Sequence, residues 1–172
     1  MVPGRQTLAI IKPDAVSHPI LLKHIGEAII AKGFLVKRAC RVRLTLAEAK
    51  ELYSVHLGKF FYERLVRHMA SGPVLAMQLE STTTSDAIAA WRALLGPSKL
   101  YANLIAHSTI PIDQRPLRQQ FALSDTRNMA HGSDSPDEVT REMAVFEPYL
   151  QPVTDQSQLF RLPPSILSTD TD

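Results

Sequence analysis

The fold is decided by residues 7–44, which read TLAIIKPDAVSHPILLKHIGEAIIAKGFLVKRACRVRL. The first five form an apolar run that stops before Pro13, and such a run predicts a buried strand. Between Ile20 and Lys32 apolar side chains return every three or four positions, and Gly33 follows, which predicts a helix and its end. Residues 34–44 alternate and predict a second strand with one face in water.

The second strand carries its expected faces in its sequence. We expect one face to hold Val36, Cys40, Val42 and Leu44, and the other to hold Lys37, Arg41 and Arg43. Arg38 breaks this alternation once. A strand with one apolar and one basic face indicates a sheet that is covered on one side.

The rest of the chain continues to alternate between the two kinds of element. We expect helices at 45–53, 59–70, 85–95 and 135–146, and strands at 74–79 and 121–123. The third of these helices ends at Gly96-Pro97, and residues 98–116 then form a long connection without periodicity. Residues 125–134 are polar and predict a loop. In the helix at 59–70, we expect Phe61, Leu65 and Met69 to share the buried face.

This order predicts an α+β fold, with helices on one face of an antiparallel sheet. The ferredoxin-like split βαβ sandwich is the simplest arrangement that fits. We expect one domain over residues 1–150 and a polar, proline-containing tail over 151–172, which lies on the surface or is disordered. Leu159, Phe160 and Leu162 are candidate anchors for the tail.

Composition narrows the classes of protein. Nineteen Lys and Arg face seventeen Asp and Glu, so the charge gives no reason to expect nucleic-acid binding. Cys40 is the single cysteine, which excludes an intramolecular disulfide. No apolar run of about eighteen residues would span a membrane. Only five residues precede the first strand, too few for a signal or transit peptide, so we expect an intracellular protein.

The histidines are scattered without the spacing of a metal site, and no Walker-type glycine loop is present. The chemistry therefore has to be sought among single side chains. The most informative stretch reads NMAHGSDS, residues 128–135. In it His131 stands before a glycine and just ahead of a predicted helix start. Small polar neighbours leave room for an anionic substrate, and a neutral imidazole is a good nucleophile near neutral pH.

Other side chains are candidates for the same site. Glu142 shares a helix face with Ser135 and can turn back to orient His131. Lys12 ends a buried strand, where a phosphate can bind. Arg92 and Arg118 can clamp a phosphate chain through bidentate hydrogen bonds. In the run Phe60-Phe61-Tyr62, consecutive residues cannot all face the core, so one of them can stack on a base. Taken one at a time, each of these residues also fits an ordinary surface or core position.

Several of these segments resemble the nucleoside diphosphate kinases. The run around His131 is similar to that family's active-site signature. Residues 7–16 (TLAIIKPDAV), Phe60-Phe61-Tyr62 with Leu65-Val66, and Ser71-Gly72-Pro73-Val74 match further family segments in the same order. The resemblance extends from about Thr7 to Phe146. Phe60 to Leu65 and Thr126-Arg127-Asn128 look most like the divergent type 6 branch of group II.

The resemblance implies the fold, the reaction and the roles of individual residues. The family fold is ferredoxin-like. The reaction moves the γ-phosphoryl group of a nucleoside triphosphate to a nucleoside diphosphate through a phosphohistidine, by a ping-pong mechanism. His131 would be the nucleophile, held by Glu142 and Ser133. The implied contacts to phosphates, sugar and base are Lys12, Tyr53, Phe61, Leu65, Arg92, Ser98, Arg118 and Asn128.

The resemblance also implies the cofactor and the partners. Mg²⁺ would be carried by the nucleotide phosphates, and the partners would be nucleoside tri- and diphosphates. Ser98 stands where the family has threonine, and Gln119 stands where it has glycine. Residues 98–117 are longer than in common members, which makes a homo-oligomer doubtful and leaves Arg115 as an alternative to Arg118.

Two questions stay open at this level. The first is compartment: the cytoplasm is expected, with the mitochondrion as the alternative that the type 6 resemblance raises. The second is activity. A partner-dependent regulatory or interaction protein that binds nucleotides with little turnover is the alternative to an active kinase.

Overall fold

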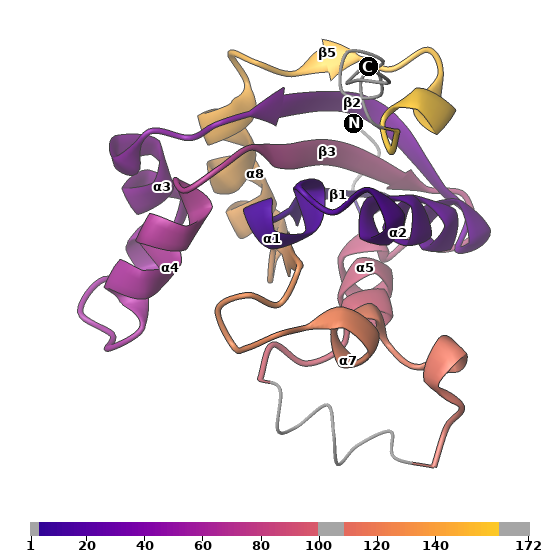
Figure 1. Ribbon diagram of the computed structural model, residues 1–172. Helices are drawn as coiled ribbons and strands as arrows, with labels where there is room; N and C mark the ends of the chain where they lie inside the picture. Colours follow the sequence, from indigo (N-terminus) through magenta and orange to yellow (C-terminus); the bar gives the residue numbers. More distant parts are fainter. Residues whose placement is uncertain (1–3, 100–108, 162–172) are drawn as a thin grey trace, which may run out of the picture.

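The computed structural model describes residues 4–99 and 109–161. Within them, five strands form one antiparallel sheet in the order β4-β1-β3-β2-β5 (Figure 1). The strands are β1 (Gln6–Ile11), β2 (Phe34–Val42), β3 (Val74–Ser81), β4 (Ala130–Gly132) and β5 (Gln151–Pro152). Strands that are neighbours in the sheet are distant in the chain, so the sheet collects side chains from distant segments at one place.

Helices cover both faces of this sheet, as the opposite positions of α2 and α8 in Figure 1 show. On one face lie α1 (Pro13–Val16), α2 (Pro19–Ala31), α5 (Ala87–Leu95) and α7 (Leu117–Phe121). On the other lie α3 (Leu46–Leu52), α4 (Tyr62–Met69) and α8 (Pro136–Phe146). The short 3₁₀ turns are η1 (Ser54–His56), η2 (Ile112–Gln114) and η3 (Gln156–Gln158).

The α+β fold with an antiparallel sheet and surrounding helices is confirmed, but the expectation of helices on one face is wrong. The reason is visible in β3, whose first six side chains are all buried. Leu75, Met77 and Leu79 belong to one core, while Val74 and Ala76 belong to the other. A strand that is apolar on both faces needs cover on both.

An irregularity in β2 overturns the predicted faces of that strand. The register with β3 shifts between Val36 and Arg38. Val36 therefore packs in the core beside α2, whereas Cys40 and Val42 pack against the core beside α8. The single break of alternation at Arg38 marks a bulge, which moves every later side chain to the opposite face. Lys37, Arg41 and Arg43 are exposed as expected. After the bulge, however, Arg41 lies on the same face as the buried Ala39, so the strand has no single face in water.

Three other local predictions were wrong. Phe121 ends the helix α7, so no strand occupies 121–123. The predicted loop at 125–134 contains the strand β4, whose residues pair with β1. In α4 the buried face is Tyr62, Val66 and Met69, while Phe61 and Leu65 are only half-buried. The helix starts three residues later than expected, so Phe61 lies just before it and the predicted face cannot be counted from that residue.

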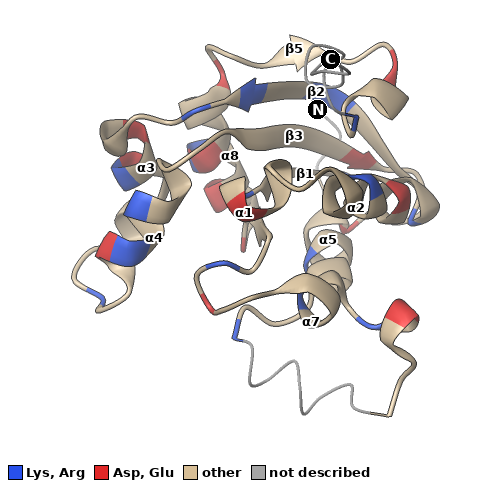
Figure 2. Cartoon of the chain, viewed as in Figure 1, with Lys and Arg blue, Asp and Glu red and all other residues tan. Residues whose placement is uncertain are grey.

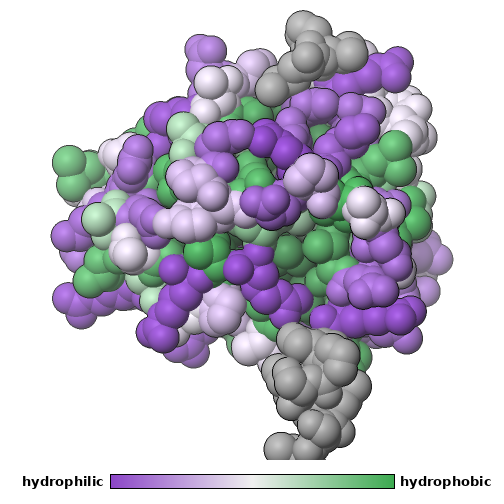
Figure 3. All heavy atoms as spheres, turned by 90° about the horizontal axis from the view of Figure 1, so that it is seen from above, coloured by the Kyte–Doolittle hydropathy of each residue, from purple (hydrophilic) through white to green (hydrophobic). Residues whose placement is uncertain are grey.

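The C-terminal segment packs on the edge of the sheet as far as it is described. β5 pairs with Arg38 and Ala39, and the backbone N–H of Val36 donates to Oε1 of Gln156 at 2.9 Å. Phe160 is 6% exposed and belongs to a core. Leu162 lies outside the described residues. Viewed from above, hydrophilic and hydrophobic side chains are interspersed on the surface (Figure 3).

Charged residues of both signs occur on α2, α4 and α8 (Figure 2). This mixture agrees with the formal net charge of +2. Among the described residues, no helix is both long and apolar enough to cross a bilayer.

Candidate active site

His131 lies in β4, opposite Ile10 of β1, at the edge of the sheet. The chain then turns directly into α8. Ser135 caps this helix by accepting a hydrogen bond from the backbone N–H of Glu138 at 3.2 Å, and Pro136 occupies its first turn. The cap and proline were predicted from the sequence, and they fix where α8 begins. Glu142 lies about two helical turns after Ser135, on the same face of the helix, and therefore faces back toward β4.

His131, Glu142 and Ser133 form one hydrogen-bonded group. Nε2 of His131 is 2.8 Å from Oε2 of Glu142, and Oγ of Ser133 donates to the same oxygen at 2.6 Å. Because a carboxylate only accepts, Nε2 carries the hydrogen, and Nδ1 is left with its lone pair. Ser133 and Glu142 are buried, whereas the His131 side chain is 17% exposed. The arrangement thus orients a reachable imidazole with Nδ1 as its nucleophilic atom.

Gly132 allows the close packing of this segment. A Cβ atom there would lie 2.9 Å from Cδ1 of Trp91. The indole Nε1 of Trp91 donates to the carbonyl of His131 at 3.1 Å. Sharp turning is not the reason for this glycine, because the positive φ in the segment belongs to Met129, at 68°.

Lys12 follows β1 and is buried, with 3% exposed. Its Nζ donates to Oδ1 of Asn128 at 2.7 Å and to the carbonyl of Thr126 at 3.2 Å. Burial, and next the charge of Arg118, lower the pKa of Lys12 to about 7, while Asp14 opposes the shift. Any anion that enters the site would therefore stabilise the charged form of Lys12.

Two arginines approach the strand that carries His131. Arg118 donates to the carbonyls of Gly96 at 2.8 Å and Ala130 at 2.7 Å, and its buried Nε has no partner among residues 4–99 and 109–161. Arg92 donates to the carbonyl of Gly132 at 3.0 Å and pairs with Asp134. Burial first, then the charge of Arg92, lower the pKa of Arg118 to about 10.

Arg115, the alternative to Arg118, is held elsewhere. Its Nε donates to the carbonyl of Ile110 at 2.6 Å, whereas Arg118 contacts the residue next to His131. The geometry therefore favours Arg118 as the arginine of the site.

Aromatic rings extend from His131 to the predicted base position. The Tyr53 ring lies 5.5 Å from the His131 ring, the His56 ring 6.2 Å from Tyr53, and Phe61 5.4 Å from His56. The Tyr53 hydroxyl is buried and has no hydrogen-bond partner in the part of the chain that the structure describes. Burial, then the charge of Glu142, raise its pKa. A buried hydroxyl without a hydrogen-bond partner destabilises the fold, so a ligand group that bonds this hydroxyl would bind more tightly.

Asn128 and Ser98 complete the predicted set. Asn128 donates through Nδ2 to the carbonyls of Ser98 at 3.2 Å and Asp125 at 3.0 Å, besides accepting from Lys12. Ser98 is exposed just after α5. Leu65 lies one helical turn after Phe61 and is half-buried. Apart from Leu65, the predicted residues are thus connected by hydrogen bonds or ring contacts around β4.

Sequence reasoning missed three residues with contacts in this region. His56 lies between Tyr53 and Phe61, and Trp91 bonds the His131 carbonyl. Asp14 accepts from the backbone N–H of Met129 at 3.0 Å. The position of His56 three residues after Tyr53 is a signal for a shared helical face; the other two contacts span long stretches of chain and leave no local signal.

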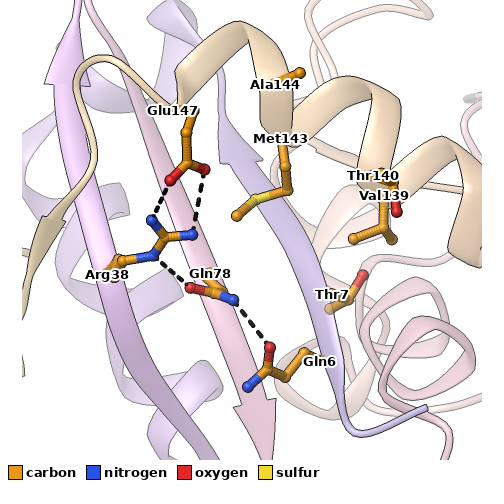
Figure 4. A pocket seen from close by; sticks show the side chains of 9 residues that line it. All are labelled: Gln6, Thr7, Arg38, Gln78, Val139, Thr140, Met143, Ala144 and Glu147. Carbon is orange, nitrogen blue, oxygen red and sulfur yellow. Dashed lines mark hydrogen bonds and ion pairs between the residues drawn. The ribbon is translucent and has the colours of Figure 1, made fainter. Parts of the chain in front are cut away.

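A separate hollow lies on the α8 face of the sheet, beside the ion pair of Arg38 and Glu147 (Figure 4). Its volume is about 320 Å³, and none of its lining side chains belongs to the predicted site. In the described part of the chain, His, Cys, Asp and Glu form no group of three that could hold a metal ion.

A family model of nucleoside diphosphate kinases matches residues 5–149. The chain belongs to this family. The match covers strands β1 to β4, both helical layers and all the predicted site residues. Membership makes the protein a relative of nucleotide-binding phosphotransferases, in agreement with the resemblance seen in its sequence.

Individual relatives refine this placement. Nucleoside diphosphate kinase 6 of Mus musculus is 42% identical over 83% of this chain and 70% of its own length. That of Homo sapiens is also 42% identical, over 83% and 72%. Nucleoside diphosphate kinase of the bacterium Hydrogenovibrio crunogenus is 37% identical over 82% and 91%. The type 6 resemblance is thereby confirmed.

The fold has a close counterpart among solved structures. A crystal structure of the Aquifex aeolicus nucleoside diphosphate kinase superposes with a TM-score of 0.70 and 34% identity. It covers 83% of this chain and 94% of the other.

Proposed function

We propose that this protein is an active nucleoside diphosphate kinase, which passes the γ-phosphoryl group between nucleotides through phospho-His131. The observation that carries the proposal is the orientation of one imidazole: Nε2 bonds Glu142, and Nδ1 is left as the nucleophile at a partly exposed position. Membership of the family and the nearby cations support it.

The reaction balances through two transfers. The lone pair of Nδ1 attacks the γ-phosphorus, the N–P bond forms, and the bond to the bridging oxygen breaks with its electrons going to the departing diphosphate. A second nucleoside diphosphate then attacks the phosphorus and restores the free imidazole. The Glu142 carboxylate, 2.8 Å from Nε2, offsets the positive charge that develops on the ring.

Lys12, Arg92 and Arg118 would offset the charge of the phosphate chain, which is most of what phosphoryl transfer requires. The Tyr53 hydroxyl and Arg118 Nε are buried donors that no described residue pairs, and they would bond substrate oxygens. Phe61 would stack on the base, and stacking tolerates every base. We take the substrate to be the Mg²⁺ complex of the nucleotide, as the family implies.

The test is formation of a phosphoenzyme. We expect purified protein mixed with γ-labelled ATP and Mg²⁺ to take up acid-labile phosphate, and His131→Ala to take up none. His24→Ala, on an exposed helical position, is the matched control and should label like the wild type. Unlabelled wild-type protein would rule out the kinase reading, and equal label in His131→Ala would rule out the assigned nucleophile.

One observation favours a second candidate, a regulatory protein with low turnover that acts with a partner. In the described chain, Arg118 donates hydrogen bonds to the backbone carbonyls of Gly96 and Ala130, and Arg92 forms an ion pair with Asp134. Such arginines must exchange partners before they clamp phosphates. This candidate predicts that the protein binds nucleotides but transfers almost no phosphoryl groups between them until the partner is added. Rapid phosphoryl transfer by the purified chain alone would contradict it.

A further inference from the structure

The backbone just before His131 is in an unfavourable conformation. Met129 has φ of 68°, which a side chain with a Cβ rarely adopts. The backbone N–H of Ala130 donates to the carbonyl of Asn128 at 3.0 Å, so Met129 is the centre of a γ-turn. Met129 is fully buried. Such a conformation persists only where the surroundings hold it, and it is common at functional sites.

Both backbone groups of Met129 are held by the turn that follows β1. The N–H of Met129 donates to Oδ2 of Asp14 at 3.0 Å. Its carbonyl accepts from the backbone N–H of Lys12 at 2.8 Å. The two segments are more than a hundred residues apart in the chain, so only the fold brings the clamp together.

The second oxygen of Asp14 is held by His68 in the last turn of α4. Nε2 of His68 donates to Oδ1 of Asp14 at 2.8 Å. The side chains are 10% and 9% exposed, so water competes little for this hydrogen bond. Asp14 is thereby fixed in the orientation that receives the Met129 amide.

We propose that His68 is a positioning residue for the nucleophile: through Asp14 it holds the γ-turn at Met129 and so sets the position of His131. The side-chain hydrogen bond of His68 goes to Asp14, whereas His131 and Ser133 bond to Glu142. Its effect passes through one carboxylate and two residues of backbone. The expected effect on the reaction rate rests on the proposed function of His131. The support of the γ-turn by His68 rests on geometry alone.

The kinetic test compares His68→Phe with His68→Gln. Phenylalanine removes the donor, whereas the amide nitrogen of glutamine reaches about where Nε2 lies and can still donate to Asp14. We expect the rate constant of His131 phosphorylation at saturating ATP to fall about tenfold in His68→Phe, since a small displacement of reacting groups is enough. We also expect ADP affinity to change less than about twofold and His68→Gln to stay near wild type.

The matched control is His24→Phe, the same substitution on the exposed surface of α2. A His68→Phe protein that phosphorylates at the wild-type rate would overturn the proposal. So would a His68→Gln protein as slow as His68→Phe, because the donor would then have no role. If His68→Phe does not fold, His68→Ala carries the same expectations without added volume.

A second readout is independent of catalysis. We expect hydrogen exchange of the Met129 amide, followed by NMR, to accelerate about tenfold in His68→Phe and to remain near wild type in His68→Gln. Unchanged exchange in His68→Phe overturns the proposal. If the wild-type protein takes no phosphoryl label, the proposed function fails, while this exchange measurement still decides whether His68 supports the turn.

Discussion

Lys12 shows at the scale of a residue how burial prepares a site for an anion. Its ammonium group is buried beside the guanidinium of Arg118, and both conditions lower its pKa, to about 7. Asn128 and Thr126 supply acceptors for its hydrogens. A phosphate chain would add negative charge at short range and favour the protonated form. Substrate binding and protonation of Lys12 are therefore expected to be linked.

We predict that nucleotide binding takes up a proton at about pH 8. The free protein has Lys12 largely neutral above its pKa, and the complex has it charged, so the complex binds more protons. Affinity for ADP should accordingly fall as the pH rises from about 7 toward 10. Isothermal titration calorimetry in buffers of different ionisation enthalpy measures the uptake.

Lys12→Met is the control for this linkage. It should bind ADP more weakly and without the proton uptake, because the titrating group is gone. Constant affinity of the wild type across this pH range would contradict the prediction.

At the scale of elements, α2 and the C-terminal segment are fitted to one another. Gly26 of α2 lies against Phe160, and a Cβ at Gly26 would be 2.4 Å from Cγ of that ring. The ring is buried, and the preceding residues pair with β2. The glycine, unfavourable inside a helix, is explained by this close approach.

We predict that Gly26→Ala destabilises the protein by about 1–3 kcal/mol, because the overlap with Phe160 outweighs the gain in helix propensity. Phe160→Ala should cost about 3–5 kcal/mol. In the Phe160→Ala background, Gly26→Ala should instead stabilise by about 1 kcal/mol. Urea unfolding of the four proteins measures this cycle, and equal effects of Gly26→Ala in both backgrounds would contradict the contact.

At the scale of the whole molecule, the sheet joins two cores and gathers the site at its β4 edge. Lys12 follows β1, Tyr53 follows α3, Arg92 lies in α5, and Glu142 lies in α8. A ligand that bonds groups from all these elements would stabilise the entire fold. Unfolding would have to release it, since the unfolded chain has no such site.

We predict that ADP with Mg²⁺, at about a hundred times its dissociation constant, raises the free energy of unfolding by about 2.7 kcal/mol. His131→Ala should retain most of this stabilisation, because the histidine supplies the nucleophile and the other residues supply the affinity. Denaturant titrations with and without nucleotide measure both values. A wild-type protein unaffected by nucleotide would contradict kinase and regulatory readings alike. Assembly size and compartment stay predictions.

How far the site could be predicted depended on the kind of signal. Thr45 and Glu48 form the capping box expected from their spacing, and Ser135 caps α8 as expected, because these bonds join near neighbours. His131 and Glu142 were predicted as site residues from a local sequence pattern and from the family signature. The bonds of Arg118 to Gly96 and Ala130 had no such signal, since they depend on how distant segments pack.

The sequence by itself determined the family, the α+β class and the ends of the capped helices, because local hydrogen bonds and periodic apolar residues encode them. Only the tertiary structure decided that helices cover both faces of the sheet, that β2 shifts its register at Arg38, and that Met129 is held in a γ-turn. These features arise from contacts between segments far apart in the chain. Such contacts stabilise the fold only after the loop between the two segments has closed, so no local pattern encodes them.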